Sequence, residues 1–173
     1  MEAGHGDRTA IIYDSAIIGV KECISYAELH DRVARCADVL LQNGITYGDR
    51  VIIYMPMILE LPISMLACAR IGAVHGVVFA GFSAESLSQR LIDSEAKTIL
   101  TCNAVLRGTK LLDLKSIVDN AIELGEDRCR ITHCLCIANE RAISFSESNF
   151  VPKRDFWWGE TINGMSSTCE TDV

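Results

Sequence analysis

Short apolar runs alternate along this chain with longer stretches in which apolar residues recur at helical spacing. The apolar runs predict four buried strands, at 50–54, 74–79, 97–101 and 130–137. The helical spacing predicts three helices between them, at about 59–71, 84–93 and 111–124. Because the runs are apolar on both faces, the pattern is typical of an α/β fold, a parallel sheet with helices on both faces.

The beginning of the chain predicts a hairpin followed by a long helix. Apolar runs at 9–13 and 22–24 can pair as two short strands. Ser25 and Glu28 then have the spacing of a capping box, in which each side chain accepts a hydrogen bond from the other residue's backbone N–H. Apolar residues continue at helical spacing, and Gly44 is expected to end the helix in a left-handed conformation.

The pattern weakens beyond residue 138. We expect a core over about 7–138 and a peripheral segment over 139–173, with both belonging to one partial domain. A short helix capped by Asp155 is expected in the peripheral segment. Trp157 and Trp158 could stack on a ligand, but their amphipathic rings favour a role as an anchor onto the domain.

Eight cysteines raise the question of disulfides or a metal site. Six lie inside predicted elements, where cysteine usually acts as a small buried hydrophobe in a reducing compartment: Cys23, Cys36, Cys68, Cys102, Cys134 and Cys136. The best metal candidate is the stretch 133–136, but it lacks the second, spaced ligand pair of a zinc site. We therefore favour a core strand there and expect no metal site.

The composition argues against several function classes. The net charge is −7 and the basic residues are scattered singly, which disfavours binding to nucleic acid. No apolar stretch reaches the about 18 residues that a membrane span requires, and no signal-peptide pattern opens the chain. A cytoplasmic location is therefore expected, with the mitochondrial matrix as the alternative.

Candidate ligand contacts lie in the loops after the predicted strands, since ligands of open parallel sheets bind outside the carboxyl ends of the strands. Three loops qualify: 55–57, 79–83 and 103–110. In the second loop, Gly81 permits close approach to the backbone, and Ser83 opens a helix whose N-terminus favours anions. Small residues are also common in such turns without any ligand, so both interpretations stay open.

The third loop carries two cations, Arg107 and Lys110, separated by Gly108 and Thr109. They can converge on a phosphate, because arginine supplies a planar fork of donors and lysine a point charge. Ordinary solvated surface is the alternative. We predict that the pair stands at the start of a helix, where the helix dipole disfavours cations. Because such a placement costs stability, it favours a functional role for the pair over ordinary surface.

Catalytic machinery is not evident in these residues. The chain has no nucleophile elbow, no GxGxxG and no GxxxxGK[ST] phosphate loop. His75 lies in an apolar strand, where a core histidine is the simpler interpretation. We therefore assign no catalytic residue.

Several long stretches resemble the acetyl-CoA synthetases, which are adenylate-forming enzymes. They are DRVIIYMPM at 49–57, MLACARIGA at 65–73, FAGFSAESL at 79–87, RGTK at 107–110 and DFWW at 155–158. The wording FAGFS favours the acetate-specific branch over propionate-preferring relatives. The resemblance covers most of the chain and implies part of the large N-terminal domain of the adenylate-forming fold.

Such enzymes join acetate to AMP with ATP and Mg²⁺, and then transfer the acetyl group to coenzyme A. The resemblance implies that Arg107 and Lys110 grip the phosphate end of coenzyme A, with Gly108 and Thr109 between them. It also implies that Phe79 and Gly81 line the coenzyme A path. The ATP loop, the Mg²⁺ acid, the carboxylate pocket and the catalytic lysine of the family have no counterpart in this sequence.

We therefore expect a fragment of an acetate–CoA ligase that is inactive alone. A truncated, non-catalytic isoform is the alternative; it would act as a binding or interaction module, for instance by pairing with a full-length subunit. A generic nucleotide-binding α/β domain is disfavoured because no glycine-rich phosphate loop is present.

Overall fold

The computed structural model of the protein describes residues 4–139 and 150–163 of the 173. Its central feature is a five-stranded sheet in the order β4-β3-β5-β8-β9, in which every neighbouring pair is parallel. In chain order the strands are β3 (Arg50–Met55), β4 (Val74–Phe79), β5 (Thr98–Cys102), β8 (His133–Ile137) and β9 (Asp155–Trp157). The prediction of an α/β fold with a parallel sheet is confirmed.

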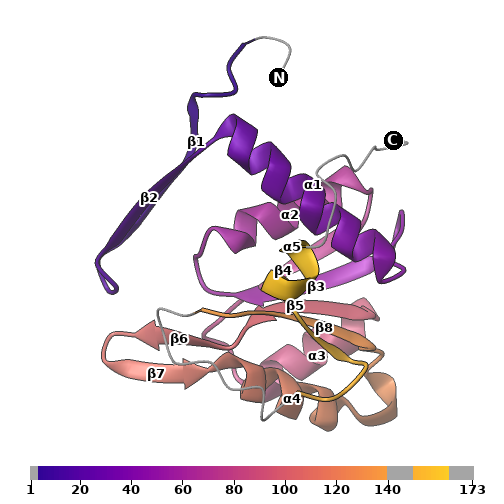
Figure 1. Ribbon diagram of the computed structural model, residues 1–173. Coiled ribbons are helices and arrows are strands. Elements are labelled where there is room, and N and C mark those ends of the chain that lie inside the picture. Colours follow the sequence, from indigo (N-terminus) through magenta and orange to yellow (C-terminus); the bar gives the residue numbers. More distant parts are fainter. Residues whose placement is uncertain (1–3, 140–149, 164–173) are drawn as a thin grey trace.

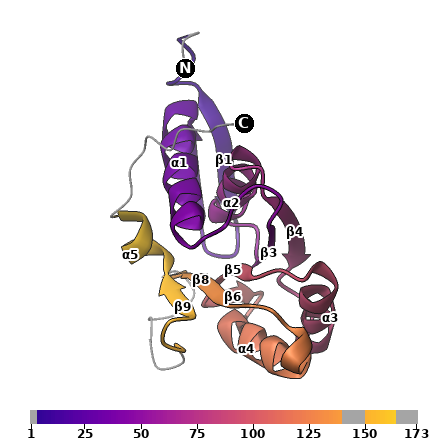
Figure 2. The same ribbon diagram turned by 90° about the vertical axis from the view of Figure 1, so that its right-hand side faces the viewer.

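Helices cover both faces of this sheet, as predicted. Figure 1 and Figure 2 show helices on both faces, and the contacts between the helices group them into two pairs. The first pair is α1 (Tyr26–Gln42) and α2 (Glu60–Arg70), and the second is α3 (Ala84–Ser94) and α4 (Leu114–Gly125). A 3-10 turn, η1 (Glu126–Arg128), follows α4, and α5 (Trp158–Asn163) contacts α1. Among the described helices, none is long and apolar enough to cross a membrane.

The first helix begins at the predicted capping box. The backbone N–H of Glu28 donates to Oγ of Ser25 at 3.2 Å, and the N–H of Ser25 donates to Oε2 of Glu28 at 2.7 Å. Gly44 follows the end of the helix with a φ of +77°, a left-handed conformation that suits glycine. The box fixes the start of α1, and α1 in turn buries an apolar stripe that includes Val33, Cys36 and Leu40.

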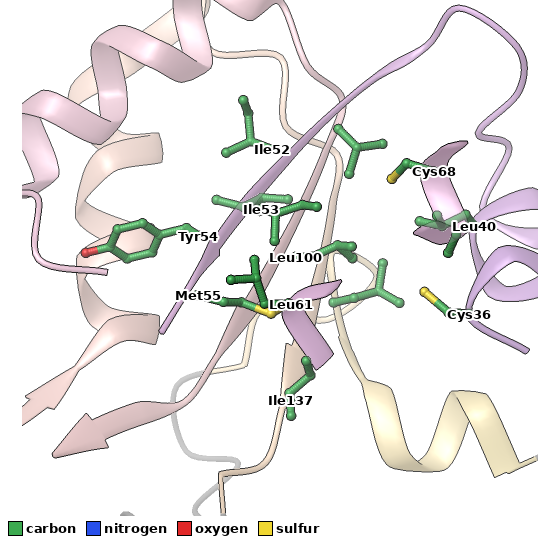
Figure 3. Packing of buried hydrophobic residues seen from close by; sticks show 14 of the residues in the cluster. Cys36, Leu40, Ile52, Ile53, Tyr54, Met55, Leu61, Cys68, Leu100 and Ile137 are labelled. Carbon is green, nitrogen blue, oxygen red and sulfur yellow. The ribbon is translucent and has the colours of Figure 1, made fainter. Parts of the chain in front are cut away.

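The core lies where the central strands pass between the two helical layers. All residues of β3 except Arg50 are buried, and so are all five residues of β5. Figure 3 shows Tyr54 pointing away from the side on which Cys36, Leu40 and Cys68 lie. Alternate residues of a strand point to opposite faces, so the central strands contribute side chains to both layers.

Most of the cysteines are core residues, as expected. Five are buried: Cys36, Cys68, Cys102, Cys134 and Cys136. Burial raises the pKa of the Cys68, Cys102 and Cys134 thiols to about 12, so all three stay protonated and unreactive at neutral pH. The prediction that Cys23 is buried is wrong; strand alternation points Ile24 inward and leaves Cys23 exposed.

Two antiparallel hairpins stand beside the main sheet. The first is the predicted one, β1 (Thr9–Ser15) with β2 (Val20–Ser25). The second was not predicted and joins β6 (Ala104–Arg107) to β7 (Lys110–Asp113). The predicted helix at 111–124 exists, but its predicted start at residue 111 is wrong. Helix α4 begins at residue 114, because the side chain of Asp113 caps it by accepting the N–H of Ser116 at 2.9 Å.

The segment around Asp155 also differs from the prediction. It was expected to be a helix, but it forms β9 and pairs with β8, and α5 begins only at Trp158. The carboxylate of Asp155 is fully buried and bonds to Lys115 and Arg154. Trp157 and Trp158 are both 8% exposed, which confirms that they anchor this segment to the domain.

Candidate functional site

The strand order reverses between β3 and β5. Strand β3 leads into α2 on one face, whereas β5 leads through the β6–β7 hairpin into α4 on the other. In open parallel sheets, the crevice outside the carboxyl ends of the strands at such a point is where ligands bind. A cavity of about 450 Å³ opens there, and the three predicted loops contribute residues 56–57, 79–80 and 105–107 to its lining; residues 13–18 of the β1–β2 hairpin line it as well.

The turn between β4 and α3 places Gly81 against Phe79. The N–H of Gly81 donates to the carbonyl of Phe79 at 2.8 Å. A Cβ atom at position 81 would lie 2.6 Å from Cε1 of Phe79 and 3.1 Å from Nη1 of Arg107. Real Cβ atoms are not found this close to a ring carbon, so only glycine leaves the ring and the guanidinium where they lie. The groups that approach Gly81 are therefore the chain's own.

The basic pair lies at the tip of the β6–β7 hairpin. Arg107 and Lys110 are cross-strand partners on either side of the turn formed by Gly108 and Thr109. Gly108 has a φ of +64°, as glycine at the first central position of a two-residue hairpin turn often does. The prediction that the pair stands at a helix start is wrong, so no helix dipole opposes it. Directly opposite residues share one face of a hairpin, which allows both cations to reach the same anion.

The charges of this pair are not neutralised within the described chain. Arg107 and Lys110 are exposed, and neither forms an ion pair with any residue in 4–139 or 150–163. The guanidinium of Arg107 instead lies over the ring of Phe79, with Cζ 6.0 Å from the ring centroid. Within the described residues, these two neighbouring cations thus lack a carboxylate partner, although the chain as a whole is acidic.

A buried tyrosine supports the turn that carries Phe79. The hydroxyl of Tyr54 donates to the backbone carbonyl of Phe82 at 2.9 Å, and its ring is fully buried. Burial also raises the pKa of this hydroxyl, which keeps it protonated as the donor. Sequence patterns do not predict this role, because Tyr54 and Phe82 are 28 residues apart and no local pattern links them.

Asn103 supports the base of the hairpin. Its backbone carbonyl accepts the N–H groups of Leu114 and Lys115 at 2.9 and 3.1 Å. Its side-chain Oδ1 accepts the N–H groups of Ala104 and Asn139 at 2.8 and 2.9 Å, which ties the hairpin to the end of β8. An asparagine directly after a strand is a common turn residue, and that signal was available in the sequence.

The structure thus brings together only part of the predicted site. Phe79 and Arg107 line the cavity, and Gly81 lies against both. Gly108, Thr109 and Lys110 lie beyond the lining, at the tip of the hairpin. His75, expected in the core, is half-buried on the edge strand β4.

The stretch 133–136 forms a core strand, as we favoured over a metal site. Cys134 and Cys136 are buried in β8, and the ring of His133 stacks on Phe156 with the centroids 6.0 Å apart. Within the part of the chain that the structure describes, no three metal-ligating side chains gather.

The parallel sheet and the sequence motifs agree with one class of protein. The family model for AMP-binding enzymes matches residues 2–171, and the chain belongs to this family. It is a homologue of acetyl-CoA synthetases. The chloroplastic/glyoxysomal acetyl-coenzyme A synthetase of Arabidopsis thaliana is 47% identical over 173 residues, and the acetyl-coenzyme A synthetase of Pasteurella multocida is 45% identical over 170.

These relatives are much longer than this chain. The matches cover 99% and 96% of the chain but only 23% and 24% of the two relatives. Among solved structures, the acyl-CoA synthetase of Brucella canis superposes with a TM-score of 0.72, covering 98% of this chain and 27% of that one. At 24% identity, that likeness supports the fold alone.

Proposed function

We propose that this chain forms the coenzyme A side of an acetate–CoA ligase. The complete reaction has two steps. Acetate first attacks the α-phosphate of ATP, which gives acetyl-AMP and releases pyrophosphate. The thiol of coenzyme A then attacks the acetyl carbonyl and releases AMP.

The observation that carries the proposal is the meeting of Phe79, Gly81 and Arg107 at the carboxyl edge of the sheet, with Lys110 opposite Arg107. Coenzyme A combines a planar adenine with several phosphates at one end. Two cations that pair with no carboxylate among the described residues suit the phosphates, and an exposed aromatic ring suits a planar base. The hydroxyl of Thr109 and the N–H of Gly108 add donors at the same turn.

The remaining parts of the reaction are proposed for residues outside this chain. The sites for ATP, Mg²⁺ and acetate belong to the full-length enzyme. This chain matches only 23% and 24% of the length of the two relatives. This chain alone is expected to bind coenzyme A without turnover. Its expected compartment is the cytoplasm, or alternatively the mitochondrial matrix.

Titration calorimetry of the purified chain tests the binding site. Coenzyme A should bind, and Arg107→Ala should weaken binding about tenfold, because a charge-assisted hydrogen bond to phosphate is lost. Arg128→Ala removes another exposed arginine, on η1, and should leave the affinity unchanged. Equal heats for the wild type and Arg107→Ala would remove Arg107 from the site.

The ligand itself supplies a second test. Coenzyme A that lacks its 3′-phosphate should bind more weakly than coenzyme A, and the difference should shrink in Lys110→Ala if the pair contacts that phosphate. A pyrophosphate-release assay with acetate and ATP tests whether the activation step needs residues outside this chain. Substantial acetate-dependent release by this chain alone would contradict the proposal that the activation step lies elsewhere.

A further inference from the structure

Four side chains form a row that ends at the cavity, in the order Arg90, Phe82, Phe79 and Arg107. The guanidinium carbon of Arg90 lies 4.6 Å from the ring centroid of Phe82. The rings of Phe82 and Phe79 meet edge to face, with centroids 6.5 Å apart and an interplanar angle of 85°. Arg107 lies over the far end of the row, with Cζ 6.0 Å from the Phe79 centroid. The outer members, Arg90 and Arg107, therefore touch one connected pair of rings.

Helix α3 holds the head of Arg90 in place. Nη1 of Arg90 donates to the backbone carbonyl and to Oγ of Ser86, both at 2.7 Å. The side chain forms no ion pair with a carboxylate in the described part of the chain, so its head is held by Ser86 and by the ring of Phe82. A cation over an aromatic face is attracted by the ring quadrupole, and arginine also stacks on the ring by its flat surface.

Phe82 is fixed at its backbone as well as at its ring. Its carbonyl accepts the hydroxyl of Tyr54, and its N–H donates to the carbonyl of Phe79 at 3.1 Å. Phe79, in contrast, is 56% exposed, and its ring lies beside the ring of Phe82, the guanidinium of Arg107 and Gly81. A half-exposed ring is free to adopt other rotamers, so the neighbours that it does contact influence its orientation.

We propose that Arg90 is a positioning residue for the nucleotide end of coenzyme A. By holding Phe82, it fixes the orientation of the Phe79 ring against Gly81 and Arg107. A flat aromatic face is thereby oriented for stacking next to the basic pair. Arg90 acts through Phe82 and touches no ligand. The inference rests on the proposed function, since it assumes that coenzyme A binds along Phe79.

A double-mutant cycle tests the route from Arg90 through Phe82. Arg90→Met and Phe82→Leu should each raise the Kd for coenzyme A about two- to fivefold, the range expected for an exposed cation–π contact. The double variant should bind no more weakly than the weaker single variant, because both changes break the same contact. Arg90→Lys keeps a cation over the ring and should recover most of the affinity. Fully additive losses, or no loss in Arg90→Met, would overturn the inference.

The matched control is Arg128→Met. It removes the same charge from an exposed position on η1, an element that contributes no side chain to the row, and it should leave the Kd unchanged. A Kd that rose equally in Arg128→Met and Arg90→Met would mean that only the net charge matters, and the positioning role would be rejected.

A measurement without coenzyme A separates this inference from the proposed function. The chain has five phenylalanines, so ring signals of selectively labelled protein can be assigned by NMR. Arg90→Met should shift the ring signals of both Phe82 and Phe79, and Arg128→Met should shift neither. An unmoved Phe79 signal overturns the inference whether or not coenzyme A binds. A moved signal with no binding by the wild type refutes coenzyme A as the ligand and leaves the control of Phe79 by Arg90 established.

Discussion

Nζ of Lys115 lies 2.8 Å from Oδ2 of Asp155, and this pair joins α4 to β9 in the interior of the protein. The two side chains are 5% and 0% exposed. Arg154 bonds to the other carboxylate oxygen of Asp155 at 2.6 Å, and Asp119 accepts from Lys115 at 2.7 Å. Two cations and two carboxylates thus compensate one another, and the cluster fastens the last strand of the sheet.

Asp155→Asn should lower the free energy of unfolding by about 3 kcal/mol, because it leaves buried cations without one of their two counter-charges. Arg50→Met serves as the control, since it breaks the exposed Arg50–Glu95 pair and should cost at most about 1 kcal/mol. Denaturant unfolding followed by circular dichroism measures both. Equal losses in the two variants would mean that burial does not strengthen the cluster.

The same cluster predicts how β9 responds to pH. Burial raises the pKa of Asp155, but hydrogen bonds from Arg154 and Lys115 outweigh it and hold the pKa below its ordinary 3.8. The stabilisation is therefore complete above pH 3.8 and is lost as the pH falls further. For Lys115, bonds to Asp119 and Asp155 outweigh burial and raise the pKa above 10.5, so its contribution is complete below pH 10.5 and is lost above it.

Both tryptophans of the chain lie in this segment, at positions 157 and 158, so their fluorescence reports on it alone. As the pH is lowered below 3.8, their emission should shift to the red first. The helical signal in circular dichroism should fall only at a lower pH. Asp155→Asn should abolish this early step. Coincident transitions by both probes in the wild type would show that β9 does not detach separately.

Local signals in the sequence predict the main elements well. Ser25 and Glu28 mark the start of α1 through contacts within one helical turn. Residues 111 and 112 were assigned to the following helix because their apolar side chains continue its pattern, although Asp113 and Ser116 carry an N-cap signal at the true start. Asp155 resembles an N-cap in sequence, but its partner Lys115 lies forty residues earlier, and no local pattern reveals that.

In the candidate site, too, local sequence patterns predict some features, and contacts between distant residues determine the others. Phe79, Gly81 and Arg107 could be placed at one edge of the sheet, because each follows or lies near the carboxyl end of a predicted strand. The contact of Arg90 with Phe82 depends on the path of the turn between β4 and α3, which the sequence leaves open. Only the helical spacing of Ser86 and Arg90 was visible beforehand.

Tyr54→Phe should show how far the β4–α3 turn depends on its support from the core. The change leaves the backbone carbonyl of Phe82 without its donor and should cost about 1 kcal/mol of unfolding free energy. It should also raise the Kd for coenzyme A, because the turn carries Phe79. Tyr47→Phe removes a hydroxyl from a residue that is 79% exposed and should change neither quantity. A Tyr54→Phe variant as stable as the wild type would show that water replaces the lost bond.

Gly81→Ala should weaken coenzyme A binding severalfold while leaving the fold nearly as stable as before. The new methyl group would lie 2.6 Å from Cε1 of Phe79, so the ring must move. Because Phe79 is 56% exposed, the ring can turn toward solvent, and we expect less than about 1 kcal/mol of destabilisation. Gly159→Ala is the control: a Cβ there meets nothing within 4 Å, and replacing a helical glycine should stabilise by about 0.5–1 kcal/mol. Calorimetry and thermal unfolding measure both variants. If Gly81→Ala bound coenzyme A as tightly as the wild type, the orientation of Phe79 would have no part in binding.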